Sequence, residues 1–357
     1  MSLTKEKREK IKKYLLEQIH EKKENVISNT AKTCGVSQTT VSRYIRQMLN
    51  DGIIVESKEN KSKYILKVLY SKFFPFYPKE EKLEEDAIYD SVIYPIIKDL
   101  PNNVIKIWAY VFTEMMNNAI EHAEADRICV TVRRNVLFTH VFISDNGIGI
   151  FENIKEYIYL MEGKNITLDE ALSFLFIGKL TTNKENHSGE GIFFSSRAVD
   201  DFYIFSSNRL FTHDKYDRSC SANLFDIDDR ESKQVMMDQK GTFVLINLWN
   251  NSKRELKEVF DMFSSVDKGF FKTQIPIKNM ITSGFPVSRS QARRLSSGFD
   301  KFEVVELDFS GVEDIGQAFT HELFVKFKKS HPNIELLVKN ANKNIEDMIQ
   351  RVVNTTE

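Results

Sequence analysis

The first part of the chain passes from helical to strand-like spacing of its apolar residues. Residues 5–24 place isoleucine and leucine at every third or fourth position, the spacing of one buried helix face. Ser37 is a good N-cap for a later helix of the same kind, and Gly52 ends it. Alternating apolar and polar residues then predict a hairpin. The expected elements are helices at 5–24, at 29–35 and between Ser37 and Gly52, and strands at 53–55 and 64–68.

The pattern changes at residues 73–78, where two prolines interrupt a run of aromatic residues. Because proline lacks a backbone N–H and resists helix, we expect residues 73–84 to form a linker whose aromatic residues pack against a neighbouring domain. Beyond this segment, helical patterns alternate with strand-like ones. The expected strands are 128–133, 137–144, 202–206, 222–226 and 242–248, and helices are expected around 107–123 and 192–199.

The last part of the chain alternates strand and helix. Strands at 304–309 and 334–338, with helices at 316–329 and 344–353, predict a small α/β module. A chain of 357 residues suits two or three domains. The predicted fold class is multidomain α+β, with a helical module and hairpin at 1–72, a linker at 73–84, a large domain at 85–280 and a small α/β domain at 281–357.

Charge divides the chain unevenly, although its formal net charge is only −1. Residues 1–72 hold 16 Lys and Arg against 8 Asp and Glu, whereas the rest holds 34 against 43. A basic module on an otherwise acidic chain predicts an anionic partner for that module alone. The third predicted helix carries, away from its apolar stripe, side chains that can donate to bases and phosphates: Gln38, Thr39, Ser42, Arg43 and Arg46.

The turn around Gly35, between two short helices and before a hairpin, resembles the winged helix-turn-helix family. The resemblance implies DNA as the partner of this module; a winged helix that serves protein contacts is the alternative. Winged helices often read paired half-sites, which makes a homodimer an expectation as well.

Cysteine usage and hydropathy bear on the compartment. The three cysteines are scattered and form no CxxC pair, which suits a reduced cytoplasm better than a disulfide or zinc framework. No apolar run approaches the roughly 18 residues of a membrane span, and the charged N-terminus lacks an apolar signal core. We expect a cytoplasmic protein without a membrane partner.

A column of polar residues follows the predicted helix at 107–123. Glu114, Asn118 and His122 lie one turn apart beside its apolar stripe. Buried polar groups are costly without partners. An amide oxygen suits Mg²⁺, and a carboxylate one turn away can activate an attacking water. A surface helix with solvated side chains is the alternative.

Two glycine-rich turns follow this helix. The strand at 137–144 runs into Asp145, with Gly147 and Gly149 close behind. A strand-end aspartate can accept a hydrogen bond from the exocyclic amine of a base, while glycines let the backbone approach it; a plain hairpin turn is the alternative. The second turn, residues 188–191, precedes a predicted helix whose first amides would face phosphates.

Taken in order, these motifs (ExxxNxxxH, DxGxG, GxG, and Gly241-Thr242 at a late strand) resemble the GHKL ATPase superfamily over about residues 85–275. The resemblance implies an α/β sandwich with a mixed sheet and helices on one face, and ATP with Mg²⁺ as cofactors. It implies that Asn118 holds the metal, Glu114 is the catalytic general base and Asp145 contacts the adenine amine. The other nucleotide-binding residues that it implies are His122, Gly147, Gly149, Lys179, Ser188, Gly189, Gly191 and Thr242.

Two stretches near the C-terminus, Ser288–Arg294 and Asp308–Ala318, resemble the STAS-like domains appended to bacterial ATPases. The resemblance covers about residues 283–357 and implies a module that docks onto a protein partner. Antagonist proteins of this fold carry a phosphorylated serine at the start of a helix. Here residues 316–318 read Gly-Gln-Ala, so that serine is missing, and Ser310 is expected to serve a turn or cap.

Together these features predict a DNA-binding transcriptional regulator gated by Mg-ATP binding or slow hydrolysis. One alternative is an anti-sigma-type protein serine/threonine kinase, and another is a DNA-acting ATPase such as a defence factor. A sensor histidine kinase is not expected, because residues 86–100, upstream of the polar column, contain no histidine.

Overall fold

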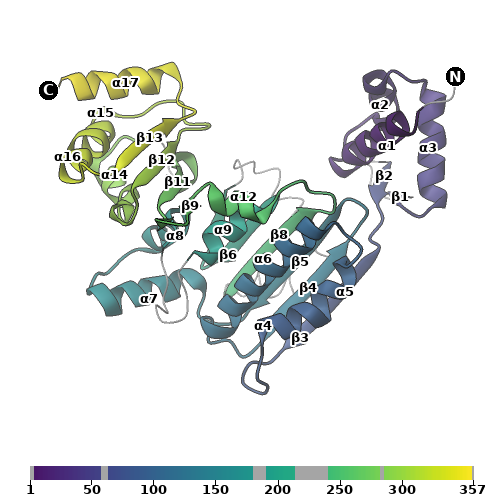
Figure 1. Ribbon diagram of the computed structural model, residues 1–357, viewed down its shortest axis with the longest axis horizontal. Coiled ribbons are helices and arrows are strands. Elements are labelled where there is room, and N and C mark those ends of the chain that lie inside the picture. The colour runs from purple at the N-terminus through teal and green to yellow at the C-terminus, as the bar shows by residue number, and fades with distance from the viewer. Residues whose placement is uncertain (1–3, 58–62, 180–189, 214–239, 282–284, 356–357) are drawn as a thin grey trace.

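The computed structural model describes residues 4–57, 63–179, 190–213, 240–281 and 285–355. A helical module with a hairpin lies at the N-terminal end, a six-stranded sheet with helices in the middle, and a three-stranded sheet with helices at the C-terminal end (Figure 1). The two end modules stand apart from each other on the central one (Figure 1). The chain is a multidomain α+β protein, as its sequence predicts.

The N-terminal module consists of α1 (Lys5–His20), α2 (Val26–Cys34), α3 (Gln38–Asn50) and a hairpin of β1 (Ile54–Glu56) and β2 (Tyr64–Leu66). The apolar stripes of the three helices meet in one core, which includes Ile11, Val41 and Ile45. Ser37 caps α3, since its side chain accepts a hydrogen bond from the backbone N–H of Thr40 at 3.2 Å. The order of elements matches the hydrophobic pattern of the sequence.

The core of this module continues into the central sheet. Leu137 and Phe138, at the start of β5 (Phe138–Asp145), are buried in the same apolar cluster as the N-terminal helices. The ring of His20, the last residue of α1, lies over the ring of Phe138 with 4.4 Å between the centroids. Burial lowers the pKa of His20, so the neutral ring is favoured there. Apolar contact therefore joins the two modules, in addition to the chain itself.

The central sheet has the strand order β3-β4-β5-β8-β6-β7, and all neighbouring pairs are antiparallel. Its strands, besides β5, are β3 (Tyr70–Phe76), β4 (Ile128–Arg134), β6 (Asp201–Ser206), β7 (Arg209–Thr212) and β8 (Thr242–Trp249). Strand β7 is missing from the expectations above. The predicted strand at 222–226 lies outside the described residues.

Residues 73–76 are part of this sheet, which corrects the linker expected at 73–84. They belong to β3, which pairs with β4 from Tyr70 opposite Arg134 to Phe76 opposite Ile128. Pro75 is tolerated because β3 is an edge strand, so its missing N–H breaks no second ladder. Consecutive aromatic residues hide the alternation that would have marked a strand.

Helices cover one face of the central sheet. The helix α6 (Asn102–Glu121) buries Val104, Trp108 and Val111 in the main core, together with apolar residues from the strands. The remaining helical segments of this module are α4 (Glu85–Ile88), a π-helical turn (Tyr89–Ile93), α5 (Tyr94–Ile97), α7 (Ile150–Glu162), α8 (Leu168–Ile177), α9 (Gly191–Ala198) and α12 (Leu256–Asp261). The apolar cluster on the opposite face contains strand residues alone. Within the described residues, no helix has both the length and the apolar character needed to cross a bilayer.

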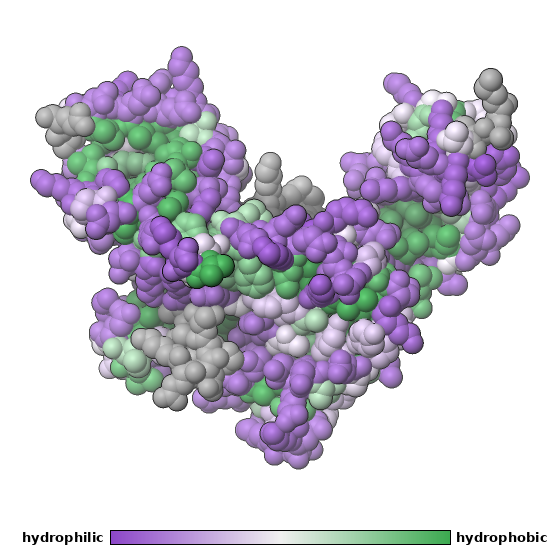
Figure 2. All heavy atoms as spheres, viewed as in Figure 1, coloured by the Kyte–Doolittle hydropathy of each residue, from purple (hydrophilic) through white to green (hydrophobic). Residues whose placement is uncertain are grey.

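The C-terminal module has a parallel sheet in the order β11 (Lys272–Pro276), β12 (Val304–Asp308) and β13 (Glu335–Lys339). A small pairing of β9 (Ser264–Ser265) with β10 (Gly269–Phe270) precedes it, and α13 (Ile277–Met280) follows β11. The other segments are α14 (Arg289–Leu295), a 3₁₀ turn (Phe299–Lys301), α15 (Gln317–Thr320), its π-helical continuation (His321–Phe327), α16 (Lys328–Ser330) and α17 (Lys343–Asn354). Figure 2 shows apolar residues gathered beneath the polar band formed by α17.

The first strand of this parallel sheet, β11, lies before residue 281, which corrects the predicted boundary between the last two domains. The pairing of β11 with β12 joins segments that are about thirty residues apart, so the local pattern could not reveal it. The chain thus contains sheets of both kinds, antiparallel in the centre and parallel at the C-terminal end.

A second apolar core joins the C-terminal sheet to two central helices. Ile177 of α8 and Phe193 and Phe194 of α9 are buried in the same cluster as Ile275 of β11. In addition, the Thr273 hydroxyl donates a hydrogen bond to the carbonyl of Ile177 at 2.8 Å. The last turn of α8 and the whole of α9 therefore contribute to two modules at once.

Candidate functional site

The polar column predicted on one helix is present on α6. Glu114 and Asn118 lie one turn apart and are half-buried, and His122 caps the C-terminal end of the helix. The backbone N–H of His122 donates to the carbonyl of Asn118 at 3.1 Å, which closes the last turn. The apolar stripe of α6 packs in the main core, which fixes the orientation of the helix. The polar column lies along the edge of this stripe.

Glu114 lies directly against the start of α9. A Cβ atom on Gly191, the first residue of α9, would come within 1.9 Å of Glu114 Oε2 and 2.9 Å of its Cδ. Real Cβ atoms do not approach other atoms so closely, so a larger residue at position 191 would require the end of the Glu114 side chain to move. The structure thereby brings together Glu114 and Gly191, two predicted site residues that are far apart in the sequence.

Asp145 ends β5 and is buried, with 4% of its surface exposed. Its Oδ1 accepts hydrogen bonds from the backbone N–H of Gly147 at 2.9 Å and of Thr242 at 3.2 Å. Burial raises the pKa of Asp145 to about 6, although these hydrogen bonds favour the charged form. A carboxyl group that titrates near neutrality in a fixed orientation is suited to ligand recognition.

Thr242 ties this corner of the sheet to α7. Its hydroxyl accepts a hydrogen bond from the backbone N–H of Ile150, the first residue of α7, at 3.0 Å. The preceding Gly241 has a φ of +81°, and a Cβ there would lie 2.0 Å from the carbonyl oxygen of Asp145. This glycine therefore allows β8 to approach the Asp145 turn.

The first glycine-rich turn is connected to the end of α6. The backbone N–H of Ile148 donates to the carbonyl of Ala123 at 2.9 Å. The Asn153 amide donates to the carbonyl of His122 at 3.0 Å. Gly149 precedes α7 as its N-terminal flanking residue. The described residues Glu114, Asn118, His122, Asp145, Gly147, Gly149, Gly191 and Thr242 thus belong to one connected region, whereas Ser188 and Gly189 lie outside the described residues.

The loop after β12 in the C-terminal module has a different arrangement. Asp308 Oδ1 accepts hydrogen bonds from the backbone N–H of Ser310 at 2.9 Å and from the Asn340 amide at 2.9 Å. Ser310 therefore stands in a turn, as expected from the sequence. The helix that follows begins after Gly316, at α15.

Residues 291–346 match a family described as a STAS-like domain of unknown function (DUF4325). This match begins a little after the start of the predicted STAS-like segment. It covers most of α14, β12, the helical segment from α15 through α16, β13 and the beginning of α17. No curated protein matches the chain. The C-terminal module is called the STAS-like module below.

Lys179 is held by the STAS-like module in this structure. Its ammonium donates a hydrogen bond to the carbonyl of Lys301 at 2.8 Å and lies 4.6 Å from the centre of the Phe302 ring. The sequence predicts Lys179 as a phosphate ligand, whereas here its side chain is engaged in a contact between modules. Sequence reasoning missed this contact, because its members are more than a hundred residues apart.

Two residues near Glu114 and Gly191 were not predicted. Tyr110, one turn before Glu114 on α6, has a raised pKa because of burial and the negative charges of Glu114 and Glu190. Arg197, on α9, donates hydrogen bonds to the carbonyls of Phe193 at 3.0 Å and Gln274 at 3.1 Å. Burial lowers the pKa of Arg197 to about 9. The helical spacing from Glu114 could have pointed to Tyr110, but nothing local marked Arg197.

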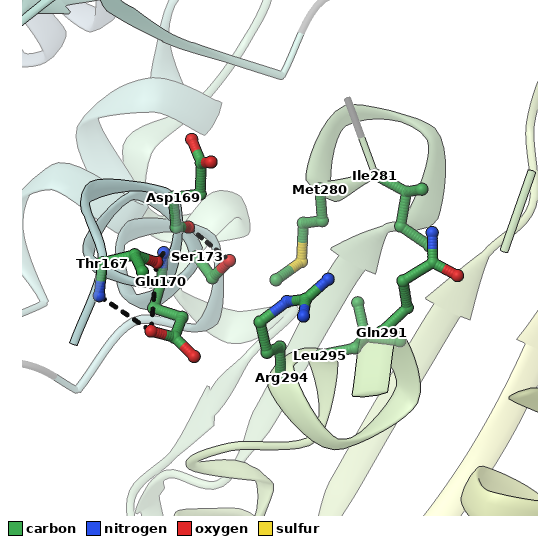
Figure 3. Close-up of a pocket in the computed structure, with 9 residues that line it drawn as sticks. All are labelled: Thr167, Asp169, Glu170, Ser173, Met280, Ile281, Gln291, Arg294 and Leu295. Atoms are coloured by element: carbon green, nitrogen blue, oxygen red, sulfur yellow. Dashed lines mark hydrogen bonds between the residues drawn. The ribbon is translucent and has the colours of Figure 1, made fainter. Parts of the chain in front are cut away.

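A cavity of about 340 Å³ lies between α8 and the STAS-like module (Figure 3). It contains none of the predicted site residues. Figure 3 shows the side chains of Arg294 and Met280 close together on one side of it, with Glu170 of α8 on the other side. Glu170 and Gln291 are already engaged in capping the helices α8 and α14. This cavity is therefore a feature of the junction between modules rather than of the predicted site.

The residues predicted to contact nucleic acid lie on α3. Gln38, Thr39, Arg43 and Arg46 are exposed and Ser42 is half-buried, while Val41 and Ile45 on the other side of the helix enter the core. The exposed side of α3 therefore presents a polar and basic surface.

Proposed function

We propose that the central module binds Mg-ATP in the manner of the GHKL ATPases, and that nucleotide binding or slow hydrolysis regulates DNA binding by an N-terminal winged helix. The observation that carries this proposal is the buried Asp145 carboxylate, fixed by Gly147 and Thr242 beside the polar column of α6. The order of helix, strand-end aspartate and glycine-started helix is the one that the family resemblance requires.

Adenine recognition would fall to Asp145. A buried carboxylate accepts a hydrogen bond from the exocyclic amine of adenine, whereas the carbonyl at the corresponding position of guanine cannot donate one. A site built to satisfy such a donor discriminates strongly against a ligand that lacks it, because buried polar groups are then left unpaired. We therefore expect ATP to bind more tightly than GTP.

Residues of α6 would bind the metal and activate the attacking water. Among the described residues no three His, Cys, Asp or Glu side chains gather as a metal site. Asn118 suits Mg²⁺ nonetheless, since this ion usually takes few protein ligands and completes its coordination with water and phosphate oxygens. Glu114 lies one turn away and against the first turn of α9, which supports its proposed role as the general base toward a water near the phosphates. His122 and Gly149 border the same region.

The proposed DNA contact rests on α3 and on the charge of its module. The exposed side of α3 presents Arg43 and Arg46 together with shorter polar side chains. Phosphate contacts from such cations would make binding strongly salt-dependent. The STAS-like module is the proposed docking point for a protein partner, and a homodimer would present two copies of α3 to paired half-sites.

The primary test is thermal stabilisation of the full chain by ATP, ADP and GTP, each with and without Mg²⁺. A ligand that binds the native state raises its stability according to its concentration relative to Kd. Stabilisation by ATP that is larger with Mg²⁺ and larger than with GTP is the expected result. If millimolar Mg-ATP leaves the melting temperature unchanged, nucleotide binding is disproved.

A second candidate, a serine/threonine kinase of the anti-sigma type, is favoured by one observation. The same chain carries a match to a STAS-like domain, the fold class of the antagonist proteins on which such kinases act. Incubation with γ-labelled ATP separates the two functions. Label on the chain or on an added partner supports a kinase, while label released only as free phosphate supports an ATPase.

A further inference from the structure

Lys179 and Lys301 hold each other by reciprocal hydrogen bonds across the junction with the STAS-like module. The Lys179 ammonium donates to the Lys301 carbonyl at 2.8 Å, and the Lys301 ammonium donates to the Lys179 carbonyl at 3.4 Å. The Lys179 ammonium also faces two aromatic rings, at 4.6 Å from the centre of Phe302 and 5.4 Å from that of Phe270. Both the side chain and the backbone of Lys179 are therefore engaged by the other module.

The backbone of Lys179 is in a strained conformation. Its φ is +51°, in the left-handed region that residues with a side chain rarely adopt. Such conformations persist only where the surroundings enforce them. The contacts with Lys301 and Phe302 supply that enforcement here, so release from the STAS-like module would also relieve the strain.

Lys179 stands close to the phosphate side of the proposed nucleotide site. The preceding Gly178 packs against α9, since a Cβ there would lie 3.1 Å from Phe193 Cδ2, two residues after Gly191. Burial lowers the pKa of Lys179, and the charge of Glu190, just before α9, acts in the opposite direction. The Lys179 side chain therefore starts beside the beginning of α9.

We propose that the STAS-like module restrains nucleotide binding by holding Lys179, through the Phe302 ring and the Lys301 carbonyl, away from the phosphates of a nucleotide bound beside Gly191. This inference rests on the proposed ATP binding. The phosphates and the STAS-like module compete for one cation, so a nucleotide that engages Lys179 shifts the population toward the released state. By reciprocity, any partner that draws Phe302 away must tighten nucleotide binding.

The test compares nucleotide affinity of the full chain with a single ring removed. Phe302→Leu deletes the aromatic face under the ammonium and keeps an apolar side chain in the core. The matched control is Phe299→Leu, the same change at a fully buried phenylalanine of the same module that packs on Phe327. Isothermal titration calorimetry measures the affinity for Mg-ATP and for adenosine. The difference between the two affinities gives the contribution of the phosphates. Phe302→Met is the second variant should the leucine variant fail to fold.

We expect Phe302→Leu to bind Mg-ATP about fivefold more tightly than the wild type, the factor that corresponds to loss of one cation–π contact at a partly buried site. Adenosine affinity should not change, and Phe299→Leu should bind both ligands as the wild type does. In a Lys179→Met background, the effect of Phe302→Leu on Mg-ATP should disappear.

Four outcomes overturn the inference. Equal Mg-ATP affinity of Phe302→Leu and the wild type excludes restraint through this ring, and an equal gain in Phe299→Leu assigns the effect to general loosening of the core. A gain that persists in the Lys179→Met background excludes Lys179 as the restrained group. Binding of neither Mg-ATP nor adenosine by any variant overturns the proposed function itself, and the inference with it.

Discussion

The Glu114 carboxylate occupies the space that a side chain at Gly191 would need, with only 1.9 Å between Oε2 and the position of a Cβ on Gly191. This relationship places the end of the Glu114 side chain against the backbone at the start of α9. It also sets the candidate general base against the first turn of the helix whose amides are proposed to face the phosphates. Changes at either residue should therefore affect both the fold and the site.

Gly191→Ala should displace the Glu114 carboxylate and cost about 1 kcal/mol of stability or less, because the overlapping atoms are the end of a flexible side chain. The cause is steric, because the alanine methyl would overlap Glu114. Urea unfolding of the variant and of the wild type measures the effect. In a Glu114→Ala background the overlapping atoms are absent, so the same substitution should cost much less. An equal cost in both backgrounds would show that the clash is elsewhere.

Asn118→Ala and Glu114→Ala should separate metal binding from turnover. Loss of the amide oxygen should abolish the gain in ATP affinity that Mg²⁺ provides. Loss of the carboxylate should leave Mg-ATP binding in place and lower the rate of phosphate release about 10²–10⁴-fold, the usual contribution of a general base. Titration calorimetry and a phosphate-release assay give the two readouts. Wild-type turnover by Glu114→Ala would remove that residue from the proposed role.

Asp145→Asn should stabilise the protein at neutral and alkaline pH. Burial raises the pKa of Asp145 to about 6, above the value of 3.8 expected for the unfolded chain. The folded state thus holds the proton more tightly, so the stability from this group is complete below the unfolded pKa and is lost as the pH rises through about 6. Asparagine cannot ionise, and the variant should exceed the wild type by up to about 3 kcal/mol near pH 8.

The control for this prediction is the same comparison of variant and wild type at low pH. Near pH 4, where Asp145 is protonated in the folded state, the variant and the wild type should have similar free energies of unfolding. Denaturant titrations at both pH values measure the difference. A variant that is less stable than the wild type at pH 8 would show that hydrogen bonds to the carboxylate outweigh its burial.

Nucleotide affinity should depend on the same proton. The adenine amine donates to an ionised carboxylate, so Mg-ATP binding should weaken as the pH falls below the Asp145 pKa of about 6. The Asp145→Asn variant should lose this pH dependence, and its preference for ATP over GTP should shrink. Binding curves for both nucleotides between pH 5 and pH 8 provide the measurement. An unchanged preference in the variant would place adenine recognition on another group.

The double variant Arg43→Ala, Arg46→Ala should weaken DNA binding. If both cations contact phosphates, the slope of log affinity against log salt should fall by about 1 for each contact removed. Electrophoretic or fluorescence titration across a range of salt concentrations gives this slope. Lys13→Ala is a suitable control, because it removes a cation of α1 that faces the Trp249 ring of the central sheet rather than the exposed side of α3. Unchanged affinity of the double variant would favour α3 as a protein-contact surface.

The sequence alone determined the elements that depend on near neighbours. The spacing of apolar residues located α3 and α6, the hydroxyl of Ser37 marked the start of α3, and the periodicity placed Glu114 and Asn118 on one edge of a helix. These features follow from helix geometry over a few residues, so they are readable without a fold. The position of Asp145 at a strand end was readable for the same reason.

Only the tertiary structure decided which distant residues meet. It placed Thr242 on Asp145, Gly191 on Glu114 and Lys179 on Phe302, and it made an edge strand of a segment whose prolines suggested a linker. Such contacts depend on strand pairing and on burial of apolar faces contributed by separate parts of the chain. The free energy of those contacts arises between residues that are far apart in the sequence, so local residue patterns do not predict them.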